Sequence, residues 1–154
     1  MADFKLDDFL PYQAAVLAGR LSRGLAQTYE ARFGLSVAEW RVMAHLHAAG
    51  RCSVREIHHQ ADLEKSRVSR AVSRLQERGF VARSVAEGDR RLVDLVLTPQ
   101  GEATVAEILP LAAAFEDRVF GQMKDAGAFR AALQDALEAL DAVEAAPEAV
   151  PDQD

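Results

Sequence analysis

The chain of 154 residues contains few of the features that mark disulfide-bonded, metal-binding or membrane proteins. Its single cysteine, Cys52, excludes an internal disulfide and a zinc site with several thiolate ligands. No apolar run approaches the ~20 residues that a membrane helix needs. Residues 1–10 contain three aspartates and lack the basic start of a secretory signal, so we expect a cytoplasmic protein with no membrane partner.

Motifs of catalysis are also missing. The sequence has no glycine-rich phosphate loop, no strained turn carrying a nucleophilic serine, and no pair of metal ligands at helical spacing. His58 and His59 are adjacent, and His45 and His47 are two residues apart, so on a helix the members of each pair point in different directions. We therefore expect no enzyme activity, no metal site and no cofactor.

The charges that are present are unevenly distributed. The formal net charge is −6, yet residues 65–91 contain eight basic and three acidic residues, a local charge of +5 that leaves −11 on the rest of the chain. A basic segment on an acidic protein is typical of a site for a polyanion, since the acidic remainder limits unspecific binding. The charge pattern therefore favours a nucleic-acid partner for this segment.

The first part of the chain has a helical pattern. Apolar residues recur at intervals of three and four from Asp8 to Phe33, and Gly34 suits the end of that helix. Two further helices are predicted to begin at capping boxes, in which a serine and a glutamate three residues later satisfy each other's free amides. These boxes are Ser36 with Glu39 and Ser53 with Glu56, and the helices are predicted to end at Gly50 and near Gln60.

A fourth helix is predicted from Glu64 to Arg78. Its apolar residues recur at helical spacing and give it an inward face, formed by Val68, Ala71, Val72 and Leu75. Its outward faces carry small hydroxyl groups between guanidinium groups, on Ser66, Arg67, Ser69, Arg70, Ser73 and Arg74.

The period then changes to that of strands. Residues 81–85 and 93–97 alternate in polarity around a polar turn that contains Gly88, which predicts a β-hairpin. Thr98 and Pro99 suit the start of a helix, predicted to reach about Met123. A last helix is predicted over residues 129–143.

This order of elements predicts a mainly α fold with a small β-hairpin wing. Residues 35–97 form the expected winged helix-turn-helix, because a short helix, a tight turn, a basic helix and a hairpin follow one another. Residues 1–34 and 98–145 form the expected N- and C-terminal dimerisation helices. Residues 146–154 are rich in Pro, Ala and acid, which predicts a disordered tail.

A helix face of serine and arginine suits the major groove of DNA, about 12 Å wide. Arginine can bind guanine O6 and N7 in a bidentate way, and serine is small enough not to block entry. The first turns of such a helix usually read the bases. We therefore expect a DNA-binding set of Lys65, Ser66, Arg67, Ser69, Arg70 and Arg74, with Ser66, Arg67, Ser69 and Arg70 at base edges and Arg74 at a phosphate. A merely solvated basic face is the alternative.

The tip of the hairpin extends this set. The predicted tip, which follows the helix of residues 64–78, contains Asp89, Arg90 and Arg91. Arginines at a hairpin tip can enter the minor groove of DNA, where the electrostatic potential is strongly negative. Asp89 could orient one arginine through a charge-assisted hydrogen bond. The alternative is a turn that is only polar.

Four segments together resemble the MarR family of bacterial regulators: residues 35–43, 68–81, 88–91 and 97–101. The resemblance covers roughly residues 8–143 and implies a homodimer joined by the first helix and the last two. It also implies a palindromic operator, with the recognition helix in the major groove and the wing in the minor groove. Most such proteins are repressors that a small ligand releases from double-stranded DNA.

Patterning supports the dimer independently. The apolar stripes of the first helix and of residues 129–143 exceed what a small winged-helix core can cover, and uncovered apolar faces usually find a partner. A monomer that packs both stripes internally is the alternative.

The resemblance implies an effector pocket between the dimerisation helices and the DNA-binding part. Arg20, Trp40 and His47 fall on the helices that would surround it. An arginine beside an aromatic ring would suit an aromatic carboxylate or its thioester, through ion pairing and stacking. The alternatives are a core position for Trp40 and a surface charge or dimer salt bridge for Arg20.

Three other functions remain open from the sequence. A winged-helix module could bind another protein and no DNA, or the chain could be an architectural DNA binder. A thiol-based redox regulator could use Cys52, if that thiol were exposed and its pKa lowered, as the neighbouring Arg51 and Arg55 would favour.

Overall fold

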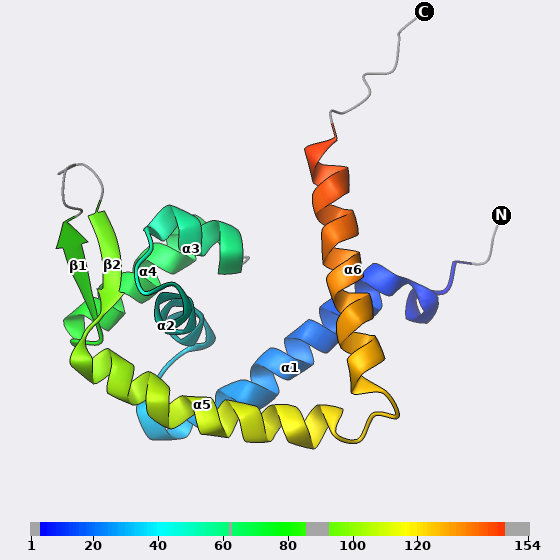
Figure 1. The fold of residues 1–154 in the computed structure, drawn as a ribbon, viewed down its shortest axis with the longest axis horizontal. Helices are drawn as coiled ribbons and strands as arrows, with labels where there is room; N and C mark the ends of the chain where they lie inside the picture. The colour runs from blue at the N-terminus through cyan, green and yellow to red at the C-terminus, as the bar shows by residue number, and fades with distance from the viewer. Residues whose placement is uncertain (1–3, 62, 86–92, 147–154) are drawn as a thin grey trace, which may run out of the picture. The chain divides into compact units, whose positions relative to one another are not determined.

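The computed structural model describes residues 4–61, 63–85 and 93–146 (Figure 1). The chain forms two compact units, residues 1–115 and residues 116–154. The boundary between the units lies within a helix, so the sequence-based division at residues 34/35 and 97/98 stays a prediction. Of the tail expected to be disordered, residues 147–154 lie outside the described residues.

The predicted succession of helices and a hairpin is confirmed. The first unit contains η1 (Leu6–Asp8), α1 (Leu10–Phe33), α2 (Val37–Ala49), α3 (Val54–Ala61), α4 (Lys65–Glu77), β1 (Val81–Val85), β2 (Val93–Leu97) and most of α5 (Pro99–Phe120). The second unit contains the end of α5 and α6 (Ala126–Ala145). The first helix begins two residues later than predicted, because Asp7 and Asp8 belong to the 3-10 turn η1.

Both capping boxes form as the sequence predicts. The Ser36 N–H donates to the Glu39 carboxylate over 2.7 Å, and the Glu39 N–H donates to Ser36 Oγ over 3.3 Å. The corresponding distances for Ser53 and Glu56 are 2.6 and 3.2 Å. Helices α2 and α3 therefore begin where serine side chains satisfy amides that the helix itself leaves free.

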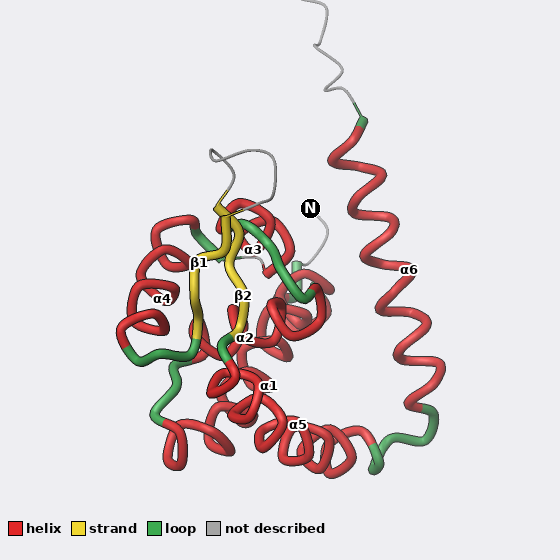
Figure 2. Tube along the Cα trace, turned by 60° about the vertical axis from the view of Figure 1, so that its left-hand side comes forward, coloured by secondary structure: helices red, strands yellow, loops and turns green. Residues whose placement is uncertain are grey.

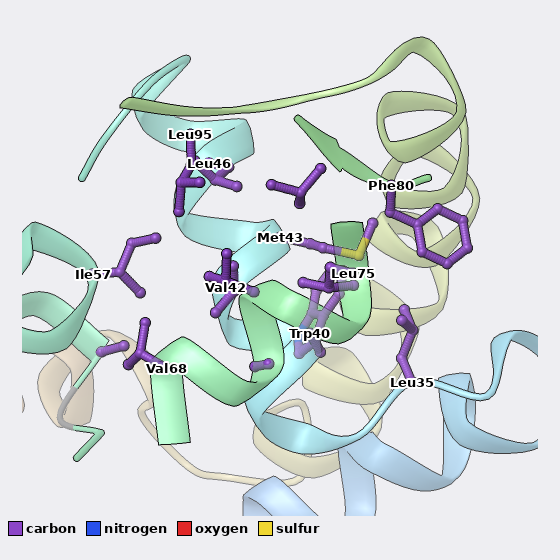
Figure 3. Packing of buried hydrophobic residues seen from close by; sticks show 14 of the residues in the cluster. Leu35, Trp40, Val42, Met43, Leu46, Ile57, Val68, Leu75, Phe80 and Leu95 are labelled. Carbon is purple, nitrogen blue, oxygen red and sulfur yellow. The ribbon is translucent and has the colours of Figure 1, made fainter. Parts of the chain in front are cut away.

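The core of the first unit is centred on α2 (Figure 3). Side chains from α2, α3, α4 and β2 meet there, and those with no exposed surface or almost none include Val42, Met43, Leu46, Ile57, Val68, Leu75 and Leu95. Burying each such side chain contributes about 1.5–3 kcal/mol. The predicted inward face of α4 is thus confirmed, since Ala71 and Val72 are buried beside Val68 and Leu75.

The hairpin is anchored at its base. Strands β1 and β2 pair antiparallel with Val81 opposite Leu97 and Val85 opposite Val93, and α4 lies beside β1 (Figure 2). Thr98 Oγ1 donates to the Gly79 carbonyl over 2.6 Å and accepts from the Gly101 N–H over 3.0 Å. The expected N-cap at Thr98 therefore begins α5 and connects it to Gly79, just after the end of α4.

The second unit is a helical hairpin with an apolar stripe. The Phe120 and Phe129 rings stack with 5.8 Å between their centroids. Asp125 caps α6 by accepting from the Ala128 N–H over 2.8 Å. Along α6 the predicted stripe is half exposed or more, at Leu133, Leu137, Leu140 and Val143.

Candidate nucleic-acid interface

Helices α3 and α4 form the helix-turn-helix. Ile57 of α3 and Val68 of α4 are both fully buried in the shared core. The turn before α4 is held by side chains, because His58 Nδ1 lies 2.5 Å from the Leu63 carbonyl oxygen and an Arg41 Nη1 donates to the Ala61 carbonyl over 3.1 Å. The N-terminus of α4 is therefore held against the core.

The polar residues of α4 lie on its exposed side, as predicted. Every member of the expected set on this helix is exposed: Lys65, Ser66, Arg67, Ser69, Arg70 and Arg74, together with Ser73. None of the four cations is paired with a carboxylate within the described parts of the chain. These side chains thus present hydroxyl groups and unneutralised positive charge to solvent.

A groove joins this surface to the start of α2. It has a volume of about 360 Å³ and is lined by Ser36, Val37, Ala38, Arg67, Arg70, Ala71 and Arg74. The N-terminus of α2 carries partial positive charge from its helix dipole, and three arginines line the same groove. The groove therefore favours a phosphate-like anion.

The contribution of residues 36–38 to this groove is absent from the sequence-based set. The sequence does contain a sign of this contribution, because the capping box at Ser36 marks a helix N-terminus, where anions are stabilised. What the sequence could not supply is the packing of α2 against α4, which places that N-terminus beside the arginines.

The wing is described only in its strands. Arg83 on β1 is exposed, and Asp94 on β2 is half-buried. The predicted DNA-contacting residues Asp89, Arg90 and Arg91 lie outside the described residues.

The three candidate effector residues have different surroundings. Trp40 is 8% exposed and packs against Tyr29 with 5.6 Å between ring centroids, which is the core position weighed as its alternative. His47 is exposed, and its Nδ1 lies 2.9 Å from a carboxylate oxygen of Glu102. Arg20 lines a cavity of about 380 Å³ that includes neither of them and is formed with Asp7, Tyr12, Gln13, Val16 and Leu17.

Cys52 lacks the surroundings of a redox-active thiol. It is 5% exposed, and burial, reinforced by the charges of Glu56 and Asp94, raises its pKa to about 11. A reactive thiol needs exposure and a lowered pKa. The redox alternative therefore finds no support in the structure.

The described residues contain neither a membrane-spanning helix nor a cluster of metal ligands. No helix among them is both long and apolar enough to cross a membrane. No group of three or more His, Cys, Asp or Glu residues in residues 4–61, 63–85 and 93–146 is placed to hold a metal ion.

Comparison with known proteins adds an independent observation. A sequence model of the MarR family matches residues 33–92. YwoH, an uncharacterised HTH-type transcriptional regulator of Bacillus subtilis (strain 168), is 32% identical over 93 residues, which are 60% of this chain and 67% of YwoH. MdtR, an HTH-type transcriptional repressor of the same bacterium, is 33% identical over 76 residues, so the match spans only 49% of that repressor and 49% of this chain.

A solved structure matches over nearly the whole chain. It is that of BpsR from Bordetella bronchiseptica, a protein whose DNA binding is regulated by 6-hydroxynicotinic acid. The TM-score is 0.74 at 25% sequence identity, and the match covers 95% of this chain and 100% of the other. The similarity therefore extends through the helices that flank the winged helix-turn-helix.

Proposed function

The chain belongs to the MarR family of transcriptional regulators, and from this premise we propose that it is a sequence-specific DNA-binding repressor, a homodimer that a small ligand releases. The observation that carries the DNA-binding role is the division of α4. Its apolar residues are buried, while its arginines and serines are exposed beside the anion-favouring groove at the start of α2.

Helix α4 lies in the major groove in this proposal. Its first turns carry Ser66, Arg67, Ser69 and Arg70, which reach base edges, because the N-terminal residues of a recognition helix usually do so. Lys65 and Arg74 bind phosphates on either side. A backbone phosphate occupies the groove that residues 36–38 line together with Arg67, Arg70 and Arg74.

The wing supplies a second contact to the duplex. Asp89, Arg90 and Arg91 lie between β1 and β2 in the sequence. Arginines at this position enter the adjacent minor groove in the proposal, and Asp89 orients one of them.

Exposed apolar side chains support the homodimer. In the first unit Phe4, Phe9 and Leu10 are between 45% and 74% exposed, and the stripe on α6 is half exposed or more. Large exposed apolar side chains gathered on one segment mark an interface. A twofold dimer places two recognition helices about one turn of DNA apart, so the operator is a palindrome.

Repression and release by a ligand are supported by relatives. MdtR is named a repressor, and the DNA binding of BpsR responds to an aromatic carboxylate. In this chain Arg20 and Tyr12 line one cavity, and a guanidinium group beside a phenol ring would bind an aromatic carboxylate or its thioester.

A footprint of the purified protein on the DNA upstream of its own gene tests the proposal. We expect a short palindromic protected site, protection that weakens steeply as salt rises, and release by one member of a panel of aromatic acids and thioesters. A protein-interaction module would protect no DNA. An architectural binder would protect DNA without a preferred palindrome.

A further inference from the structure

Arg78 joins the C-terminal ends of two helices. It follows α4 directly, and its Nη1 and Nη2 donate to the carbonyls of Gly34 over 2.9 Å and of Phe33 over 2.6 Å. These carbonyls belong to the end of α1, where a helix carries partial negative charge and lacks internal donors. The guanidinium group also lies over the Phe80 ring, 4.8 Å from its centroid.

Arg41 makes a matching connection at the other end of α4. It is a half-buried residue of α2, and its Nη2 donates to Ser22 Oγ on α1 over 3.1 Å. Its Nη1 donates to the carbonyl of Ala61, the last residue of α3, over 3.1 Å. Only three residues separate Ala61 from the start of α4.

We propose that Arg41 and Arg78 are positioning residues that tie both ends of the recognition helix to α1 and so set its orientation for operator binding. The proposal rests on the proposed function. Apolar packing is non-directional, whereas hydrogen bonds to fixed carbonyls restrict rotation and sliding. Arg20 lies two residues before Ser22 on α1 and lines a cavity. A shift of α1 that is caused by the partner subunit, or by a ligand in this cavity, then reaches α4 through these hydrogen bonds.

A direct phosphate contact is the competing role for Arg78, since it lines a cavity together with Arg74. The two roles differ in their dependence on sequence and salt. A positioning residue affects the preferred sequence and leaves unspecific binding unchanged, whereas a phosphate contact contributes to all DNA and to the salt slope.

The experiment compares full-length wild type, Arg78→Met and Arg41→Met. Affinity is measured by fluorescence anisotropy over a salt series on two duplexes of equal length, one selected by the wild type from a random pool and one unrelated. We expect each variant to lose about tenfold on the selected duplex, the equivalent of one charge-assisted hydrogen bond. Affinity for the unrelated duplex and the salt slope should not change.

Three further variants sharpen the test. Arg32→Met is the matched control. Arg32 lies 5.0 Å from the centroid of the Phe33 ring and pairs with Glu107 on α5, and it forms none of the bonds of Arg41 or Arg78. Its removal should leave the affinity for both duplexes unchanged. Ser22→Ala should reproduce part of the Arg41→Met loss and add nothing to it in the double variant. Arg78→Lys should not restore preference, because one ammonium group cannot hold two carbonyls in a planar fork.

Several results would overturn the inference. Equal losses on both duplexes with a salt slope reduced by about one, or rescue by Arg78→Lys, would make Arg78 a phosphate contact. A lowered unfolding temperature with unchanged affinity at the assay temperature would leave both arginines purely structural. If wild type selected no duplex at all, the proposed function itself would fail. If wild type selected a duplex and the variants bound it equally well, only the positioning role would fail.

Discussion

Cys52 and Leu95 exchange two backbone hydrogen bonds. The Cys52 N–H donates to the Leu95 carbonyl over 3.2 Å, and the Leu95 N–H donates to the Cys52 carbonyl over 2.9 Å. Because Cys52 directly precedes the cap of α3, this pair fixes β2 to the helix-turn-helix. The wing is thereby held by the same segment that starts the first helix of the motif.

We expect the Cys52 thiol to be unreactive in the folded protein. Burial raises its pKa from 9.0 to about 11, so little thiolate forms at pH 8. Alkylation by iodoacetamide at pH 8 should be far slower than in guanidinium-unfolded protein, and peroxide should leave DNA binding unchanged. Rapid modification of the folded protein would revive the redox alternative.

The same thiol makes stability depend on pH in the alkaline range. The pKa of the thiol is higher in the folded than in the unfolded protein, so the folded state keeps its proton to a higher pH. The resulting contribution to the free energy of unfolding is complete below pH 9 and is lost as the pH rises toward 11. The midpoint of urea unfolding should fall more between pH 9 and 11 for wild type than for Cys52→Ala. Parallel curves for the two proteins would contradict this prediction.

Gly101 should tolerate no side chain. A β-carbon there would lie 2.1 Å from the Phe80 carbonyl oxygen, a backbone atom that cannot move alone. We expect Gly101→Ala to lower the free energy of unfolding by about 3 kcal/mol. The control is Gly127→Ala in α6, where the nearest atom is 3.4 Å away and the change should stabilise by roughly 0.5–1 kcal/mol. Similar effects of the two changes would argue against the close approach of α5 to Phe80.

Arg70→Ala should cost about 1–3 kcal/mol in binding the preferred operator and should relax specificity. Arg70 is exposed on α4 and lines the groove beside α2. Competition titrations with single-base variants measure both effects, with Arg130→Ala, in the second unit, as control. Equal losses on operator and random DNA would instead assign Arg70 to a phosphate.

Arg90→Ala should weaken binding more when AT-rich sequence flanks the operator core than when GC-rich sequence does. The narrow minor groove of AT-rich DNA has the stronger negative potential, so an inserted arginine gains more there. Binding is measured on two duplexes that differ only in these flanks. Equal losses on both would remove the minor-groove role of the wing.

Leu137→Asp should dissociate the proposed dimer. Leu137 lies in the α6 stripe and is 51% exposed in the single chain. Ala142→Asp on the opposite side of α6 is the matched control, since it adds the same charge away from the stripe. Sedimentation equilibrium should give a monomer for the first and a dimer for the second. An unchanged mass for Leu137→Asp would leave the stripe without this role.

Local patterns explain which predictions succeeded. The inward and outward faces of α4 follow from helical periodicity, and the caps at Ser36 and Ser53 follow from a spacing of three residues. Both depend on residues close in sequence, so no tertiary information was needed. The start of α5 likewise follows Thr98, and its end at Phe120 lies three residues before the predicted Met123.

Long-range relationships were beyond the sequence. The sequence left Trp40 between an effector pocket and a core position, and only packing shows that its ring meets Tyr29 in the core. Arg41 and Arg78 left no signal, because their acceptors include the backbone carbonyls of Ala61, Phe33 and Gly34, which any residue supplies.

The division of α4 into a buried and an exposed half also bears on how such a regulator diversifies. Val68, Ala71, Val72 and Leu75 fill the interior, whereas the residues of α4 that face solvent carry no packing constraint. Exchanging Ser66, Ser69 or Arg70 should therefore redirect the protein to another DNA sequence at little cost in stability. Under the proposed function, substitution at these few positions gives the scaffold new target genes without a compensating change elsewhere in the chain.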